Sequence, residues 1–378
     1  MKEIYLDNSA TTRVSRKAAE KAVEIMTQHY GNPSSLHSKG LEAQHDMEAA
    51  GDLVAASIGC TREEIFFTSG GTEANNTAVF GAAYALRRRG KRIVTTDIEH
   101  SSVREAMSRL EQEGFEIIRL PADINGRVSA EDIKKAITKD TILVSIMAVN
   151  NEVGSIQPIS GVKRIIEAAA SPAVFHADAV QGYLKMPLRP KKYGIDLMTL
   201  SGHKIHAPKG VGVLYKRRGV RIIPLHTGGL QQSGVRPGTE PLPLICAMGE
   251  AVREYGNTEE RTEAVKAVSE YCRAKLKNTE GIEINSPEDA LPYIINFSAV
   301  GIRSETILHY LADKGIYVSS GSACAKGQKS HVLRAMGLSD DRIDSAVRVS
   351  FSDENTEEDI DIFIKELENA LRTLARKR

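Results

Sequence analysis

The chain has 378 residues, of which 41% are hydrophobic and 26% charged, and its 50 lysines and arginines against 49 aspartates and glutamates leave a net charge of +1. At roughly 150 residues per domain this length predicts two or three domains, and the composition excludes a disordered or low-complexity chain. The near-zero net charge creates no general field that would attract nucleic acid, an anionic membrane or an acidic partner.

The first residues, Met1-Lys-Glu-Ile-Tyr-Leu-Asp7, include acids where a signal peptide needs an apolar segment. No run of about 18 apolar residues occurs, so we expect neither export nor a membrane span. The four cysteines are scattered and form no C-x-x-C pair, which argues against a disulfide framework or a zinc knuckle. We therefore expect a cytoplasmic protein.

Between about Ile65 and Tyr215, short apolar runs rich in β-branched residues alternate with helical patterns. This alternation predicts helices that cross over a mainly parallel sheet, and the continuous hydrophobicity of the runs is typical of strands covered on both faces. The predicted strands are Glu64–Thr68, Arg92–Thr96, Phe115–Leu120, Ile142–Met147, Ala173–Ala177, Leu197–Leu200 and Val211–Tyr215. The predicted helices between them are Thr72–Arg89, Ser101–Glu113 and one that Ser129 caps. The basic run Arg87-Arg88-Arg89 is interpreted as a solvated helix end, and direct contact with nucleic acid is not expected.

From about Thr239 to Lys277 the pattern becomes a long helical stretch with charged faces, and we place a domain boundary there. Beyond it we expect strands near Ile294–Phe297 and Val347–Phe351, a helix at Ser304–Lys314 and a last helix from about Thr356. The prediction is an α/β protein with a large domain, residues 15–255, and a smaller α+β C-terminal domain, residues 256–378. Residues 1–14 are expected to pack with the smaller domain.

Three of the predicted strands are followed by residues suited to chemistry, and open α/β sheets bind ligands beyond the carboxyl ends of their strands. The turn Thr68-Ser-Gly-Gly-Thr72 would gather helix N–H groups for an anion, although such a turn can also be purely structural. Asp178 ends a buried strand, where it either meets a cation or caps the next helix. Lys204 follows another strand and is either a solvated charge or a desolvated amine able to bond to a carbonyl carbon.

An anion-binding turn, a buried acid and a strand-end lysine together match the requirements of pyridoxal 5'-phosphate. The cofactor needs an amine for its aldehyde, an acid for its pyridine nitrogen and a cradle for its phosphate. His203 and His206 could suggest a metal pair, but no acidic third ligand stands near them in the sequence, and no metal is expected.

Motifs along almost the whole chain resemble those of the cysteine desulfurases of the NifS/IscS family, which have the aspartate-aminotransferase-like fold of pyridoxal-phosphate-dependent transferases. Ordered matches of this number are not expected by chance. They are Tyr5–Thr12, Gly31–Ser34, Thr68–Glu73, Glu99-His100, Val149–Gly154, His176–Asp178, Ser201–Lys204, Arg236–Thr239, Ser319–Cys324 and Val347–Ser350.

The resemblance implies a role for each of several residues. Lys204 would bond to the cofactor's aldehyde, Asp178 would pair with the pyridine nitrogen, and Gln181 with the ring hydroxyl. His100 would lie against the ring face, with Asn151 beside the cofactor. The phosphate would be held by Gly71, Thr72, Ser201 and His203, and by Thr239 of a second subunit, which implies a homodimer with shared active sites. Asn32 and Arg348 would hold the substrate carboxylate.

Cys324 lies in a small, polar stretch, Ser319–Ser330, which is typical of a loop, whereas Cys60, Cys246 and Cys272 are interpreted as small buried hydrophobes. Lys326 and Lys329 would favour the thiolate form of Cys324. The resemblance implies that Cys324 takes the sulfur of L-cysteine as a persulfide and that L-alanine leaves, with His100 handling the thiol proton.

Other functions on the same fold stay open, namely a selenocysteine lyase, an aminotransferase or a non-catalytic sulfur-transfer adaptor. The sulfur acceptor implied by the family is an iron–sulfur scaffold protein or a tRNA-thiolating enzyme. The Cys324 stretch is about two residues shorter than in housekeeping members of the family, and no longer C-terminal tail follows Leu374. We therefore do not expect the standard scaffold interaction.

Overall fold

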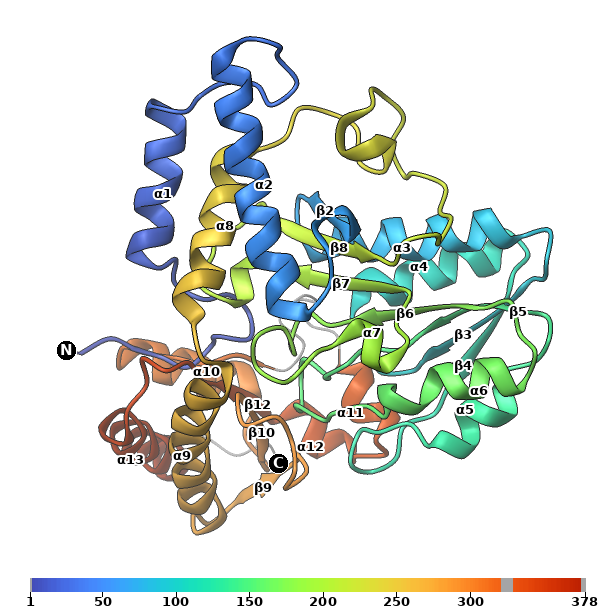
Figure 1. Ribbon diagram of the computed structural model, residues 1–378. Helices are drawn as coiled ribbons and strands as arrows, with labels where there is room; N and C mark the ends of the chain where they lie inside the picture. Colours follow the sequence, from blue (N-terminus) through green and yellow to red (C-terminus); the bar gives the residue numbers. More distant parts are fainter. Residues whose placement is uncertain (1, 321–328, 375–378) are drawn as a thin grey trace.

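The computed structural model describes residues 2–320 and 329–374, and its largest feature is a twisted sheet (Figure 1). Within these residues seven strands pair in the order β2-β8-β7-β6-β5-β3-β4. β8 runs antiparallel to both of its neighbours, and the other pairs are parallel. The mainly parallel seven-stranded sheet of the prediction is confirmed. The strands are β2 (Ile65–Thr68), β3 (Arg92–Thr96), β4 (Glu116–Leu120), β5 (Thr141–Ser145), β6 (Val174–Asp178), β7 (Leu197–Ser201) and β8 (Gly212–Lys216).

Both faces of this sheet are buried. Alternate residues of a strand point to opposite sides, so adjacent residues belong to different cores. Ile93 and Leu143 pack under the helices of one face, while the adjacent residues Val94 and Val144 belong to the core of the other. Burial on both faces explains why the sequences of these strands are continuously hydrophobic. The crossover helices are α3 (Gly71–Leu86), α4 (Ser101–Gln112), α5 (Ala130–Ala136), α6 (Val162–Ala168) and α7 (Pro190–Tyr193).

Three further helices stand together beside the sheet: α1 (Arg16–Thr27), α2 (Ser38–Ile58) and α8 (Leu242–Tyr255) (Figure 1). The first two were not predicted from the sequence. The buried side of α2 consists largely of alanine and glycine, which give only a weak apolar pattern. A close approach of backbones explains this choice, because a Cβ on Gly249 of α8 would lie 2.9 Å from the Cα of Ala50.

The long helical stretch predicted from Thr239 to Lys277 is two helices, α8 and α9 (Thr258–Lys277). Gly256 separates them with a φ of +59°, a conformation that glycine adopts readily, and the side chain of Asn257 caps the start of α9. The rest of the C-terminal part consists of β9 (Ile282–Ile284), β10 (Ile294–Ala299), α10 (Ser304–Asp313), β11 (Ile316–Tyr317), α11 (His331–Ala335), α12 (Asp340–Asp344), β12 (Ala346–Ser350) and α13 (Glu357–Thr373).

In this C-terminal part an antiparallel sheet has the order β12-β10-β9, and Thr356 begins α13 with a capping box to Asp359, as predicted. The N-terminal strand β1 (Ile4–Tyr5) pairs with β11, and Asp7 forms a bridge to Ser350 at the end of β12. The N-terminal segment therefore lies beside β11 and β12 of the C-terminal part.

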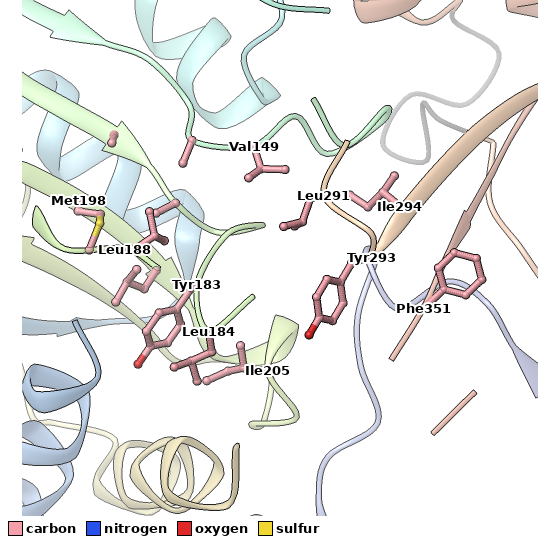
Figure 2. Close-up of a cluster of buried hydrophobic side chains, with 14 of the residues drawn as sticks. Val149, Tyr183, Leu184, Leu188, Met198, Ile205, Leu291, Tyr293, Ile294 and Phe351 are labelled. Carbon is pink, nitrogen blue, oxygen red and sulfur yellow. The ribbon is translucent and has the colours of Figure 1, made fainter. Parts of the chain in front are cut away.

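One apolar cluster joins the two sheets. Figure 2 shows side chains from β7 and the segment after β6 beside side chains from the segment around β10 and from Phe351. The labelled residues of this cluster are Val149, Tyr183, Leu184, Leu188, Met198, Ile205, Leu291, Tyr293, Ile294 and Phe351. A shared core of this kind holds the ends of β5, β6 and β7 against the C-terminal part. No helix of the described residues is long and apolar enough to cross a membrane.

Candidate active site

A cavity of about 490 Å³ lies where the carboxyl ends of β5, β6 and β7 meet the start of α3. The structure brings most of the predicted site residues together in its wall, although they come from distant parts of the chain. They are Gly71, Thr72, His100, Asn151, Asp178, Gln181, Ser201, His203, Lys204 and Arg348.

The carboxylate of Asp178 is buried at the end of β6 and accepts two hydrogen bonds from neutral donors. Val180 N donates to Oδ1 at 3.0 Å, and Asn75 Nδ2 donates to Oδ2 at 2.7 Å. The first bond closes a turn after β6, whereas the alternative left open by the sequence was a helix cap; the next helix, α7, begins only at Pro190. None of the ion pairs formed by the described residues includes Asp178, so its negative charge faces the cavity without a cationic side chain of its own.

His100 is connected to Asp178 by a chain of polar side chains. Asn75 Nδ2 also donates to Ser102 Oγ at 2.9 Å, and Ser102 Oγ lies 2.8 Å from His100 Nδ1. The backbone N–H of Ser102 donates to the same Nδ1 at 3.2 Å. Because an N–H can only donate, Nδ1 is the acceptor and the neutral ring carries its proton on Nε2. Burial lowers the pKa of His100 and so favours this neutral form.

The predicted anion-binding turn begins α3. Gly70 has no side chain to cap the helix, and the first helical residue is Gly71, so the first N–H groups of α3 have no side-chain partner from Gly70. The hydroxyl of Ser201 is buried beside this turn without a hydrogen-bond partner. Glycine is required nearby at Gly212, where a Cβ would lie 2.6 Å from the carbonyl carbon of Gly70.

Lys204 stands in the short helical turn Gly202–Lys204 after β7 and reaches the N-terminal segment. Its Nζ donates to Ala10 O at 2.8 Å and also to Ser9 O. Gln181 Nε2 donates to Ser9 O at 3.0 Å, while Gln181 Oε1 is buried without a partner. Burial and the charge of Lys204 lower the pKa of His203 to about 3, so the imidazole is neutral.

Arg348 of β12 is 3% exposed and forms the C-terminal side of the cavity. Its Nη1 donates to Asn151 O at 2.8 Å and its Nη2 to Asp7 Oδ1 at 2.9 Å, while Nε has no partner. Burial raises the pKa of Asp7, and the Arg348 guanidinium opposes this shift. The guanidinium is therefore held from two sides and keeps one buried donor for a ligand.

Two of the predicted site residues that the structure describes, Thr239 and Asn32, do not line this cavity in the single chain. Thr239 is exposed on the connection that leads to α8, and Asn32 is exposed between α1 and α2, where its Oδ1 accepts from Ser34 N at 2.9 Å. Cys324 lies outside the described residues. Lys329, which was expected to favour the Cys324 thiolate, forms ion pairs at 3.1 and 3.3 Å with Asp340 and Asp344 of α12. The expected effect of Lys329 on the Cys324 thiolate stays a prediction, because Cys324 is outside the part of the chain that the structure describes.

The other cysteines largely follow the prediction. Cys246 and Cys272 are buried, and Cys60 is only partly buried because it lies at the exposed end of α2. Burial raises the pKa of each of these thiols to about 12, which makes them poor sources of thiolate.

Sequence reasoning missed several residues of the cavity. Asn75 and Ser102 form the link between Asp178 and His100, and Arg104, Glu152 and His331 complete the wall. A signal existed for Asn75, because it follows Thr72 by three residues and so lies on the same face of α3. No such spacing signal exists for His331, which reaches the cavity only through the packing of α11.

The fold and this cavity place the chain among the α/β proteins with an aspartate-aminotransferase-like fold. The family model described as aminotransferase class-V matches residues 4–363. A NifS/IcsS protein homolog of Lactobacillus delbrueckii subsp. bulgaricus is 46% identical over 96% of this chain and 95% of its own length. A cysteine desulfurase IscS of Dictyoglomus turgidum is 39% identical over 99% of this chain and 95% of its own length.

Solved structures agree with these relatives. A NifS-like protein superposes with a TM-score of 0.94 at 39% identity, covering 99% of this chain and 100% of its own. The chain belongs to the aminotransferase class-V family and, within it, to the NifS/IscS cysteine desulfurases. The resemblance noted in the sequence is confirmed.

Proposed function

We propose that this protein is a cysteine desulfurase that removes sulfur from L-cysteine, releases L-alanine and carries the sulfur as a persulfide on Cys324. The proposal rests on the observation that Lys204, Asp178 and His100 line one cavity. The buried Asp178 carboxylate forms no ion pair with a described residue, and His100 is neutral. Relatives that are 39% to 46% identical over nearly the whole chain support the same activity.

The cavity fits pyridoxal phosphate at its ring end. The buried Asp178 would pair with a protonated pyridine nitrogen and would gain the cation that the described residues do not supply. The unpartnered Gln181 Oε1 would accept from the ring hydroxyl. When bound, the cofactor would supply an electron sink that stabilises negative charge at the α-carbon of an amino acid.

The cavity also fits the cofactor at its phosphate end. The first N–H groups of α3 at Gly71 and Thr72 would bind the phosphate, together with the unpartnered hydroxyl of Ser201. His203 is neutral and would add an N–H donor. Lys204 reaches the cavity from the turn after β7, where its amine would bond to the cofactor's aldehyde carbon.

The substrate would be oriented by Arg348, whose unpaired Nε is buried and ready to donate to a carboxylate. Asn32 would assist it if a rearrangement or a second subunit brought Asn32 to the cavity. Lys204 Nζ would take the proton from the substrate α-carbon. His100 carries its proton on Nε2 in this hydrogen-bond arrangement, so it would act first as a proton donor on the cavity side.

The sulfur step would use the thiolate of Cys324 as the nucleophile. Its sulfur forms a bond to the substrate sulfur while the bond between the substrate sulfur and Cβ breaks. The electron pair of the broken bond stays on the substrate carbon skeleton, which becomes alanine after two protons are added, and the sulfur stays on Cys324 as a persulfide.

We also propose that two copies of the chain form a homodimer in which Thr239 of one subunit completes the phosphate site of the other, and that residues 15–255 and 256–378 act as large and small domains. The exposure of Thr239 supports the first proposal, and the separation of the seven-stranded sheet from the three-stranded sheet supports the second. The persulfide would pass to an acceptor protein in the cytoplasm, either an iron–sulfur scaffold or a tRNA-thiolating enzyme.

The proposed function is tested by comparing the purified protein with its Cys324→Ser variant. We expect both to be yellow with bound cofactor, and we expect alanine and sulfide to form from L-cysteine under reductant only when Cys324 is present. Equal turnover by the variant would instead support a selenocysteine lyase or an aminotransferase, which the ratio of alanine to pyruvate separates. A colourless protein that binds no added cofactor would support a non-catalytic adaptor.

A further inference from the structure

Ser319 and Ser330, the first and last residues of the stretch that contains Cys324, are both described and are both hydrogen-bonded to residues of the cavity wall. On the N-terminal side, Ser319 and Arg348 exchange two backbone hydrogen bonds, at 2.6 and 3.1 Å. On the C-terminal side, Ser330 Oγ donates to Glu152 Oε2 at 2.5 Å. Arg348 and Glu152 both line the cavity.

Ser330 is held without freedom to rotate. It is buried, and its hydroxyl caps α11 by accepting from Leu333 N at 3.0 Å. Because the hydroxyl has one proton, and this proton is used for Glu152, the two bonds together define its rotamer. The bond to Glu152 therefore links the N-cap of α11 to a residue of the cavity wall.

Glu152 places its carboxyl in a buried position, where it accepts the hydrogen bond from Ser330. It is 3% exposed, and the ion pairs formed by the described residues do not include it. Its backbone is fixed by Asn150 Oδ1, which accepts from Glu152 N at 2.8 Å, and by Asn296 Nδ2, which donates to Glu152 O at 3.3 Å. Burying an acid is costly, so a rigidly placed buried acid that spends one oxygen on a serine indicates a specific task.

The turn that contains Glu152 also contacts Arg348, the residue proposed to bind the substrate carboxylate. Asn151, the residue before Glu152, accepts from Arg348 Nη1 through its carbonyl at 2.8 Å. The turn Val149–Gly154 thus contacts the proposed carboxylate-binding arginine with one residue and the start of α11 with the next. A shift of this turn would move both together.

We propose that Glu152 is a positioning residue for sulfur transfer: through Ser330 it sets the C-terminal end of the Cys324 segment relative to Arg348 and the bound substrate. This inference rests on the proposed role of Cys324 as the sulfur acceptor. It assigns Glu152 to the transfer of sulfur and not to the removal of the α-proton, which Lys204 performs.

The two steps can be measured separately in the cofactor-loaded enzyme. Exchange of the α-proton of L-alanine for deuterium, followed by NMR, reports on Lys204 and needs no cysteine on the protein. Persulfide formation on Cys324 in a single turnover with L-cysteine, followed by alkylation and mass spectrometry, reports on sulfur transfer. We expect Glu152→Ala and Ser330→Ala to slow persulfide formation at least tenfold more than they slow α-proton exchange.

Three further variants distinguish positioning from a loss of stability. Glu152→Gln keeps an oxygen that accepts from Ser330, so it is expected to restore persulfide formation to within about threefold of wild type. The double variant Glu152→Ala/Ser330→Ala is expected to be no slower than the slower single variant, because both remove the same bond. Ser339→Ala is the matched control, since Ser339 caps the neighbouring helix α12 without touching Glu152.

Three outcomes would overturn the inference: an equal loss in both assays, a Gln variant as slow as the Ala variant, or a Ser339→Ala variant that shows the same selective loss. Failure of the proposed function has a different signature, because the wild-type enzyme would then form no persulfide on Cys324. If wild type forms the persulfide and Glu152→Ala forms it equally fast, only the inference about Glu152 is wrong.

Discussion

Several polar side chains of this site lack a hydrogen-bond or ion-pair partner that they could bind. Asp178 accepts from two neutral donors and forms no ion pair with a described residue, Gln181 Oε1 has no hydrogen-bond partner, and Arg348 Nε is unpaired. Each unmet interaction costs free energy in the free protein and becomes favourable when a complementary ligand binds. The proposed cofactor would satisfy Asp178 and Gln181 with its pyridine nitrogen and ring hydroxyl, and the proposed substrate would satisfy Arg348 with its carboxylate.

Replacing Lys204 is the most direct test at the residue scale. Lys204→Ala removes the amine that would bond to the cofactor, so we expect the visible absorbance of bound cofactor to be lost on gel filtration and alanine formation to fall at least ~10³-fold. Lys204→Arg is the matched control for folding, because it keeps donors for Ser9 O and Ala10 O. A Lys204→Ala protein that keeps a tenth of wild-type turnover would contradict the assignment.

Buried His176 gives a residue-scale prediction on stability. The imidazole is hydrogen-bonded to Ser145 and Thr199, and burial lowers its pKa to about 4 from the usual 6.5. The unfolded chain therefore binds a proton that the folded chain does not between these pH values, so stability falls as the pH drops from about 6.5 toward 4.

The loss from this one group is at most about 1.4 kcal/mol per pH unit. It is measured as the thermal midpoint of unfolding across this pH range. His176→Gln keeps a polar side chain that does not titrate, and it should flatten the slope relative to wild type. An unchanged slope in this variant would show that other groups cause the acid destabilisation.

At the scale of elements, the active site depends on how closely two backbones approach. Gly212 of β8 leaves room for the turn that begins α3, because a Cβ there would lie 2.6 Å from Gly70 C and 2.9 Å from Leu200 O. Antiparallel pairing of β8 with both β2 and β7 places this glycine between the anion-binding turn and the strand that leads to Lys204. The geometry of the turn is thus a property of three strands.

We expect Gly212→Ala to displace the Gly70 turn and to weaken cofactor binding at least tenfold, with a loss of stability of about 1–3 kcal/mol from overpacking. The measurements are a fluorescence titration with cofactor and a denaturant melt. Gly161→Ala is the control, because no atom lies within 4 Å of a Cβ at that position and its φ is negative. Unchanged cofactor affinity in Gly212→Ala would mean that the turn is not a phosphate site.

At the scale of the whole molecule, the single chain exposes large apolar side chains. Leu36 and Leu230 are fully or almost fully exposed, at 105% and 89% relative accessibility, and they lie four and nine positions along the sequence from Asn32 and Thr239, the predicted site residues that do not line the cavity. Exposed large apolar side chains of this kind are typical of a subunit interface. Both observations support the proposed homodimer.

Leu230→Asp should weaken this dimer, because it places a charge in an apolar contact. We expect sedimentation velocity to show a dimer for the wild type and an at least tenfold higher dissociation constant for the variant. Ile124→Asp, a substitution of another exposed apolar residue on a turn far from Leu230 in the sequence, serves as the control. A wild-type monomer with full activity would contradict the shared active site.

The sequence by itself determined the elements and the kinds of chemistry. All seven strands of the main sheet follow from the local density of β-branched apolar residues, and Asp178 and Lys204 are recognisable because a strand's carboxyl end is a local feature. Capping by Ser129 and Thr356 is equally local, since a cap needs only the next three residues.

Only the tertiary structure decided which of these residues meet. Hydrogen bonds link Asp178 to His100 through Asn75 and Ser102. Two other hydrogen bonds join Arg348 to Asp7, 341 positions away, and Ser330 to Glu152. Their partners are selected by the packing of α3, α4, β1 and α11 around the sheet, for which no short spacing in the sequence is diagnostic. The break of the long helical stretch at Gly256 has instead a local cause that the sequence prediction overlooked, because Gly256 adopts a positive φ and the side chain of Asn257 caps α9.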